Sequence, residues 1–213
     1  MGLKKNKMDT EILKPFGPSI VKVKIPLEII DQMNLFVDKI TNDKNKLEKF
    51  NEGEKLVGNV YQEFLMDTDF MQKIKWAEFL GSACSKWIWQ ERSIQLKSFE
   101  IIKSWIVRQF KNEYNPIHSH SGHISGVGYL KVPKTMGKTT QKDKKINNNG
   151  KLVLIDGSKK LFCYPTLTIK PCIGDMYLFP SYLMHAVYPF SDTEEERRSI
   201  SFNAKIDDQA SSI

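Results

Sequence analysis

The hydrophobic pattern of the chain changes its period near residue 95, from about four residues to two. Before this point, apolar residues recur at helical steps from Leu27 to Ile40 and again from Phe70 to Ile88. After it, apolar and polar residues alternate in short runs that glycine, proline and asparagine interrupt. Helical steps place apolar side chains on one face of a helix, whereas alternation places them on one face of a strand. The chain is therefore predicted to be an α+β protein with its helices first.

The N-terminal part, residues 1–95, is predicted to be a polar arm over 1–14 followed by a strand and supporting helices. Residues 19–25 alternate β-branched and charged side chains, as a half-buried strand does, and Pro26 then opens the first helical pattern. Residues 42–55 are charged and are predicted to be a connection. A second helix is predicted over residues 68–90. Its three tryptophans are expected in the core, as aromatic residues at helical spacing usually are: Trp76, Trp87 and Trp89.

The C-terminal part, residues 96–206, is predicted to be an antiparallel sandwich or jelly roll, because its short strands follow one another without intervening helices. Residues 133–150 form the one long polar insert and are expected to be an exposed loop or a lid. With 213 residues the chain is expected to be a single domain, residues 1–213. The predicted strands are 99–110, 125–132, 151–155, 167–170, 175–179, 185–188 and 199–205.

Composition narrows the classes of function. The 32 Lys and Arg exceed the 25 Asp and Glu, but much of this excess lies in two lysine-rich stretches, 3–7 and 134–145, without a basic helical stripe. Nucleic-acid binding is therefore not favoured. Three cysteines without a CxxC spacing indicate a reducing, cytoplasmic setting, and the absence of about 18 consecutive apolar residues argues against a membrane span.

All four histidines of the chain fall in two short segments, which indicates a metal site. His118 and His120 are two positions apart, so on extended backbone their imidazoles leave the same face and can converge on one ion. His185, at the entrance of a predicted strand, is expected to be their distant partner. His123 lies in a Ser-Gly-rich bend and is expected to contact the substrate or to support the ligands.

An arginine and a serine follow His185 at the same two-residue spacing. On a strand, Arg197 and Ser199 would offer a guanidinium and a hydroxyl to one carboxylate. Taken alone, Arg197 would more often be a surface charge paired with the acidic residues 194–196. Its position after His185 favours the anion site.

These segments resemble the iron(II)- and 2-oxoglutarate-dependent oxygenases, especially the small oxygenases found in marine bacteria and their phages. The resemblance spans about residues 105–205. It is carried by residues 115–120 (NPIHSH), 125–130 (SGVGYL), 174–185 (GDMYLFPSYLMH) and 196–203 (ERRSISFN). It implies a double-stranded β-helix, or jelly roll, with supporting N-terminal helices and a metal at the open end of the jelly roll.

The resemblance also implies the cofactors and their ligands. Fe(II) would be held by His118, His120 and His185, and 2-oxoglutarate by Arg197 with Ser199. His120 stands where the family usually has a carboxylate, which leaves Asp156 or Asp175 as alternative ligands. Two tyrosines would lend hydroxyls to the keto acid, and two asparagines would contact the substrate or support the site: Tyr129 and Tyr177, and Asn115 and Asn203.

The activity so implied is hydroxylation of a C–H bond, with O2 consumed and 2-oxoglutarate decarboxylated to succinate, and with ascorbate as a reductant. The primary substrate would be a small molecule or a protein side chain, and the setting a cytoplasm, the host's if the chain is encoded by a phage. One alternative is a three-histidine, cupin-like metalloenzyme without 2-oxoglutarate, either a dioxygenase or a zinc hydrolase. Another is a non-catalytic β-sandwich binding module.

Overall fold

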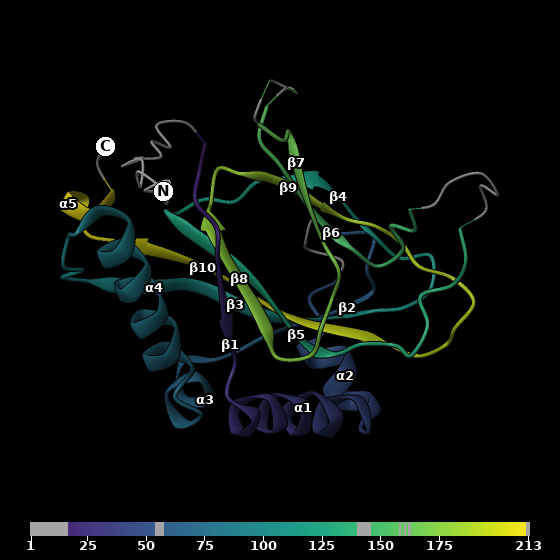
Figure 1. Cartoon of the computed structure of the whole chain (residues 1–213). Helices are drawn as coiled ribbons and strands as arrows, with labels where there is room; N and C mark the ends of the chain where they lie inside the picture. The colour runs from purple at the N-terminus through teal and green to yellow at the C-terminus, as the bar shows by residue number, and fades with distance from the viewer. Residues whose placement is uncertain are drawn as a thin grey trace, which may run out of the picture.

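The structure is a computed structural model in which two antiparallel sheets face one another and helices cover the outer face of the larger sheet (Figure 1). It describes residues 17–53, 58–139, 146–157, 159, 161 and 163–211. The polar arm expected over residues 1–14 and the tip of the polar insert, residues 140–145, lie outside the described residues.

The chain passes back and forth between the two sheets. The larger has six strands in the order β1-β8-β5-β10-β3-β2, and the smaller has four in the order β4-β9-β6-β7. From β3 onwards the chain passes repeatedly between the sheets, which is the path of a jelly roll. The strands are β1 (Val21–Lys24), β2 (Gln62–Leu65), β3 (Phe99–Gln109), β4 (Asn115–His118), β5 (Ile124–Lys131), β6 (Leu152–Ile155), β7 (Thr166–Ile169), β8 (Asp175–Pro180), β9 (Met184–Val187) and β10 (Arg197–Ile206).

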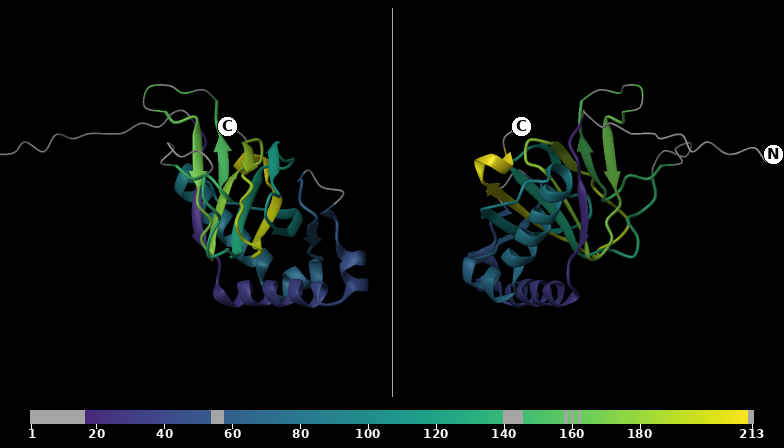
Figure 2. Two further views of the ribbon diagram at one scale, coloured as in Figure 1. Left: turned by 90° about the vertical axis from the view of Figure 1, so that its right-hand side faces the viewer. Right: turned by 60° about the vertical axis from the view of Figure 1, so that its left-hand side comes forward.

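The helices build a core against the outer face of the larger sheet. Buried residues of α1 recur at three- and four-residue steps, and they pack with the apolar residues of α4, β8 and β10. Two further views (Figure 2) show α1 well away from β7 of the smaller sheet. No helix in the described part of the chain is long and apolar enough to cross a bilayer. The helices are α1 (Leu27–Thr41), α2 (Lys44–Phe50), α3 (Thr68–Lys73), α4 (Trp76–Arg92) and α5 (Asp208–Ser211).

Successive residues of β10 face opposite sides of the larger sheet. Ile200 and Phe202 belong to the core beneath the helices. Arg197, Ser199 and Ser201 line a cavity between the two sheets. Because side chains alternate along a strand, this register places three polar side chains of one strand inside the jelly roll.

The neighbouring strand β5 alternates in the same way, but with glycine on its helix-facing side. Val127 and Tyr129 join the inner core between the sheets. A Cβ at Gly126 would come within 2.9 Å of the Met176 methyl carbon, and one at Gly128 within 2.6 Å of the Met176 sulfur. The two glycines therefore let the helix-side core approach the backbone of β5.

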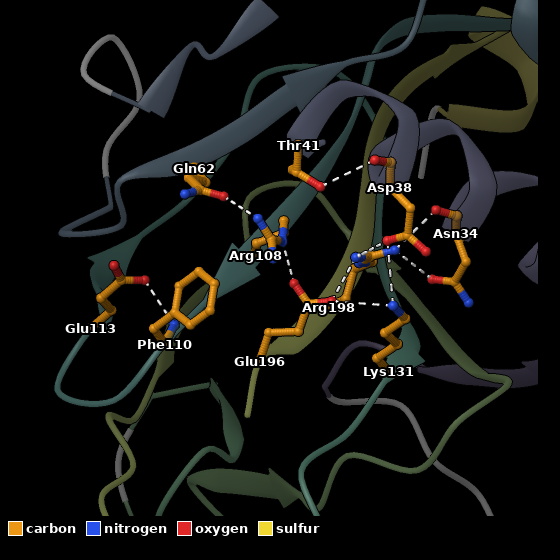
Figure 3. Close-up of polar contacts among 10 residues, drawn as sticks. All are labelled: Asn34, Asp38, Thr41, Gln62, Arg108, Phe110, Glu113, Lys131, Glu196 and Arg198. Atoms are coloured by element: carbon orange, nitrogen blue, oxygen red, sulfur yellow. Dashed lines mark hydrogen bonds and ion pairs between the residues drawn. The ribbon is translucent and has the colours of Figure 1, made fainter. Parts of the chain in front are cut away.

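An ion network on the helix-facing side ties β10 to α1 (Figure 3). The Arg198 guanidinium donates hydrogen bonds to Asp38 Oδ1 at 2.7 Å, to Glu196 Oε1 at 2.5 Å and to Asn34 Oδ1 at 3.0 Å. Arg108 of β3 also binds Glu196. The network thus joins a helix to two adjacent strands.

The strands predicted in the C-terminal half are all present, with ends shifted by one or two residues. Four short elements were not predicted: α2, β2, β4 and α5. Residues 42–55 were expected to be a connection, which is wrong for α2, whose N-cap Asp43 accepts hydrogen bonds from the backbone of Asn45 and Lys46. This helix buries no residue and therefore carries no apolar stripe. The short strand β2 was missed because its buried face includes a glutamate, Glu63.

The single helix predicted over residues 68–90 is two helices, α3 and α4. Lys75 between them has a φ of 60°, in the left-handed region, and this breaks the helical path. Trp76 and Trp87 are buried as predicted. The core prediction is wrong for Trp89, which is 58% exposed because it lies on the outer face of α4.

Candidate metal centre

Two histidines face each other across the smaller sheet. His118 ends β4 and pairs directly with His185 of β9. The Nδ1 atom of His118 lies 2.7 Å from the Pro116 carbonyl oxygen, and that of His185 lies 2.9 Å from the Leu183 carbonyl oxygen. A carbonyl can only accept, so each Nδ1 carries the hydrogen and each Nε2 presents a lone pair. Metal-binding histidines are held in this way.

His120 completes the group from the loop that follows β4. Its backbone N–H donates to the Ser181 carbonyl at 3.0 Å, and its ring packs edge-on against Trp105 with 5.6 Å between ring centroids. The ligand atoms of His118, His120 and His185 all lie within 4.8 Å of one another. The structure thus brings together the three histidines that the sequence predicted as ligands.

Burial keeps two of these imidazoles neutral. It lowers the pKa of His120 to about 3, with the neighbouring charges of His185 and His118 adding to the effect. Burial also lowers the pKa of His185 to about 4, although the hydrogen bond to Leu183 opposes the shift. Neutral imidazoles with free lone pairs are the donors that iron, zinc and copper accept. The donor set therefore fits a metal ion.

Among the described residues no carboxylate joins the three histidines. Asp175 is 2.7 Å from Lys22 and also pairs with Lys24, at the edge of the larger sheet. Asp156 lies at the end of β6, where its backbone N–H donates to the Pro165 carbonyl. Neither alternative ligand considered from the sequence reaches the histidines.

The second half of the site is Arg197, which is 1% exposed. Its Nη1 donates to Gln109 Oε1 at 3.2 Å and to Ser199 Oγ at 3.3 Å, and its guanidinium lies 5.0 Å from the centroid of the Tyr129 ring. Its Nε and Nη2 and the Tyr129 hydroxyl have no hydrogen-bond partner in the part of the chain that the structure describes. Burial lowers the pKa of Arg197 and raises that of Tyr129. The surface ion pair considered for Arg197 is thus excluded.

Arg197 and the three histidines open onto the same cavity between the sheets. The cavity is narrow, about 30 Å³. Asn115, predicted to be near the substrate, lines it as well. The lining is Trp105, Val107, Gln109, Asn115, His118, His120, Val127, Leu152, His185, Val187, Arg197, Ser199 and Ser201.

Four of the predicted residues lie outside this lining: Tyr129, which packs against Arg197, and three residues farther away. His123 is held against the end of β10, with its Nδ1 at 3.1 Å from the backbone nitrogen of Ile206. Asn203 accepts a hydrogen bond from the Ser125 hydroxyl at 2.8 Å. Tyr177 lies towards the edge strand β1, where the Lys22 ammonium is 5.6 Å from its ring centroid.

Sequence reasoning missed Trp105 and Gln109, which contact a ligand histidine and the arginine respectively. Both lie on β3 at the same alternation as Val107, so the face they occupy was readable from the predicted strand. What was not readable is that β3 pairs with β10 so that Arg197 lies opposite Gln109.

The chain was compared with protein families, curated proteins and solved structures. A family model described as "Putative 2OG-Fe(II) oxygenase" matches residues 103–203, a segment that contains the three histidines and Arg197. A search of curated proteins found no match.

Solved structures of similar fold include a Pseudomonas putida prolyl-4-hydroxylase, at 14% identity over 88% of this chain and 91% of that chain, with a TM-score of 0.54. A Trichoplax adhaerens prolyl hydroxylase in complex with a hypoxia inducible factor peptide is 15% identical over 89% and 84% of the two chains, with a TM-score of 0.53. HygX from Streptomyces hygroscopicus with nickel, 2-oxoglutarate and hygromycin B bound is 8% identical over 88% and 83%, with a TM-score of 0.57. At these identities the likeness is one of fold, and it confirms the predicted jelly roll.

Proposed function

From the premise that residues 103–203 form a 2-oxoglutarate- and iron(II)-dependent oxygenase domain, we propose that His118, His120 and His185 hold the iron and that Arg197, with Ser199, holds the distal carboxylate of 2-oxoglutarate. The co-substrates of this family are 2-oxoglutarate and O2.

The observation that carries the proposal is the buried, uncompensated charge of Arg197. Within the described residues its hydrogen-bond acceptors are a neutral amide and a neutral hydroxyl, and two of its nitrogens have no partner. A buried guanidinium without a counter-ion is costly, and a carboxylate is the anion that its planar fork binds best. Because Arg197 opens onto the same cavity as the histidines, an anion bound there lies beside the metal.

The side chains of the site orient the cofactors and exclude water. The carbonyls of Pro116 and Leu183 hold the Nδ1 atoms of His118 and His185, which leaves the Nε2 lone pairs for a metal ion. Apolar walls from both sheets surround this centre and limit access of solvent. When bound, iron(II) and 2-oxoglutarate would, together with O2, supply the hydroxylation of a substrate C–H bond, with one oxygen atom entering the alcohol, the other entering succinate, and CO2 released. Tyr129, behind Arg197, packs its ring against the guanidinium.

For the primary substrate we propose a small molecule or a protein side chain. Two structures of the same fold, one with a bound peptide and one with bound hygromycin B, support both kinds. The charge of the chain does not gather into a basic helical stripe, which argues against a nucleic acid. Cys84, Cys163 and Cys172 are unpaired, which supports a reducing, cytoplasmic setting.

The test is turnover without a primary substrate. Purified protein loaded with iron(II) under anaerobic conditions is mixed with 2-oxoglutarate, ascorbate and O2, and succinate is measured. We expect slow succinate formation that depends on iron, together with saturable binding of 2-oxoglutarate by calorimetry. The absence of both would contradict the proposal, and tightly held zinc with hydrolase activity would instead favour the three-histidine hydrolase. In Arg197→Met the binding of 2-oxoglutarate should be weakened. Arg198→Met serves as the matched control, because the two arginines are adjacent in sequence but face opposite sides of the sheet.

A further inference from the structure

Gln109 is a buried polar residue that contacts the Arg197 guanidinium from the wall of the same cavity. It ends β3, is 1% exposed and pairs with Arg197 in the register of β3 and β10. Buried polar side chains need hydrogen-bond partners, and the partners of Gln109 show which way its amide points.

Both hydrogen bonds from the Gln109 amide nitrogen go to backbone carbonyls. Nε2 donates to the carbonyl of Glu113 at 2.6 Å and to that of Tyr188 at 3.3 Å. Carbonyl oxygens cannot donate, so the amide cannot turn around without losing both bonds. Its oxygen must therefore face Arg197, where Oε1 accepts from Nη1 at 3.2 Å.

This hydrogen bond occupies one nitrogen of Arg197 but does not neutralise the positive charge of its guanidinium. A neutral acceptor holds Nη1, while Nε and Nη2 stay without a partner among the described residues. A carboxylate at position 109 would occupy the same place but would neutralise the guanidinium and act as a built-in competitor for an incoming carboxylate.

We propose that Gln109 is the positioning residue of the clamp. It fixes the guanidinium of Arg197 and, by being neutral, makes the site select keto acids that carry a distal carboxylate. The inference rests on the proposed binding of 2-oxoglutarate by Arg197, and adds to it the residue that sets the charge selectivity.

The experiment compares two keto acids of equal chain length. 2-Oxoglutarate and 2-oxopentanoate, which has a methyl group in place of the distal carboxylate, are titrated anaerobically by calorimetry into the iron(II)-loaded protein. In Gln109→Glu we expect the affinity for 2-oxoglutarate to fall at least ~30-fold, the scale of a lost buried charge pair. The affinity for 2-oxopentanoate should change by less than ~3-fold, because this ligand makes no ion pair with Arg197.

A second variant covers the case in which Gln109→Glu does not fold. Gln109→Met keeps the volume but removes the acceptor, so the ratio of the two affinities should fall by about 10-fold, the scale of a hydrogen bond to a charged group. The matched control is Gln62→Glu, which makes the same change beside Arg108 on the outer face of the sheet (Figure 3) and should leave the ratio unchanged.

The possible outcomes distinguish the positioning role of Gln109 from the proposed binding of 2-oxoglutarate by Arg197. If the wild-type protein prefers 2-oxoglutarate and a folded Gln109 variant keeps that preference, the positioning role is wrong while the clamp stands. If the wild-type protein shows no preference for 2-oxoglutarate, the clamp and the positioning role are both overturned. Loss of affinity for both keto acids in equal measure would also overturn the positioning role, because a general disturbance of the site, and not charge selection, would then explain the variant.

Discussion

Arg197 and Arg198 are adjacent in sequence and equally buried, yet their replacement should have opposite consequences. Arg198→Met removes hydrogen bonds to Asp38, Glu196 and Asn34. Charge-assisted bonds of this kind are worth about 1.5–3 kcal/mol each. The net loss is smaller than their sum because the Asp38 side chain is 43% exposed and Glu196 keeps Arg108 as a partner. We expect the free energy of unfolding to fall by about 2–3 kcal/mol.

Arg197→Met removes two hydrogen bonds to neutral groups together with a buried charge that no acidic side chain among the described residues compensates. The two effects oppose each other, so we expect the free energy of unfolding to change by less than about 1 kcal/mol. The affinity for 2-oxoglutarate should fall at least ~30-fold, since the distal carboxylate loses its counter-ion. In Arg198→Met that affinity should be unchanged at temperatures where the variant is folded.

Urea unfolding and anaerobic calorimetry on both variants measure the two quantities separately. The reverse result, with keto-acid binding lost in Arg198→Met and stability lost in Arg197→Met, would refute the register of β10. A slip of one residue turns every side chain of a strand to the opposite face. The histidines would then share their cavity with the even-numbered residues of β10.

Two further perturbations test the surroundings of the site. Burial, with Glu113 nearby, raises the pKa of Glu63 from 4.5 to about 7. The folded state therefore holds this proton more tightly than the unfolded chain, and stability should fall by about 3 kcal/mol as pH rises between these values. Urea unfolding of Glu63→Gln from pH 5 to 8 should show a flatter profile than wild type, and parallel profiles would count against the assignment. His120→Ala should lower the affinity for iron(II) by more than ~100-fold, whereas His123→Ala should leave that affinity nearly unchanged, because losing a metal ligand costs more than losing a supporting contact. Metal analysis of the two variants measures the difference. Equal losses of iron would make His123 a ligand.

Alternation along strands explains why much of the site could be predicted. Arg197 and Ser199 are two residues apart on β10, and such a pair shares a face of the sheet whatever the rest of the fold does. His118 and His120 have the same spacing, but His120 lies in the loop after β4, where its backbone bond to Ser181 holds it. Alternation predicts which face of the sheet a side chain occupies, but it does not predict how close that side chain lies to the site. Tyr177, which the resemblance suggested as a partner of the keto acid, lies on β8 next to the edge strand β1, away from the cavity lining.

Residues that depend on pairing between distant strands could not be predicted in the same way. Gln109 meets Arg197 across 88 positions of sequence, and this contact exists only because β3 and β10 pair in one register. The element β2 was hidden for a related reason. Its Glu63 is buried, and a buried glutamate breaks the apolar alternation by which a strand is recognised.

The two faces of β10 each carry a buried arginine, one compensated by carboxylates and, among the described residues, the other not. On the helix side, Arg198 is compensated by two carboxylates that also reach α1 and β3. On the inner side, the partners of Arg197 within the described part of the chain are all neutral. An uncompensated buried charge favours movements that expose it to water. The outer network opposes such movement because a slip or opening of β10 would break the ion pairs of Arg198 at the same time. Arg197 can therefore stay available to an anion inside the jelly roll because its neighbour holds the strand in register from outside.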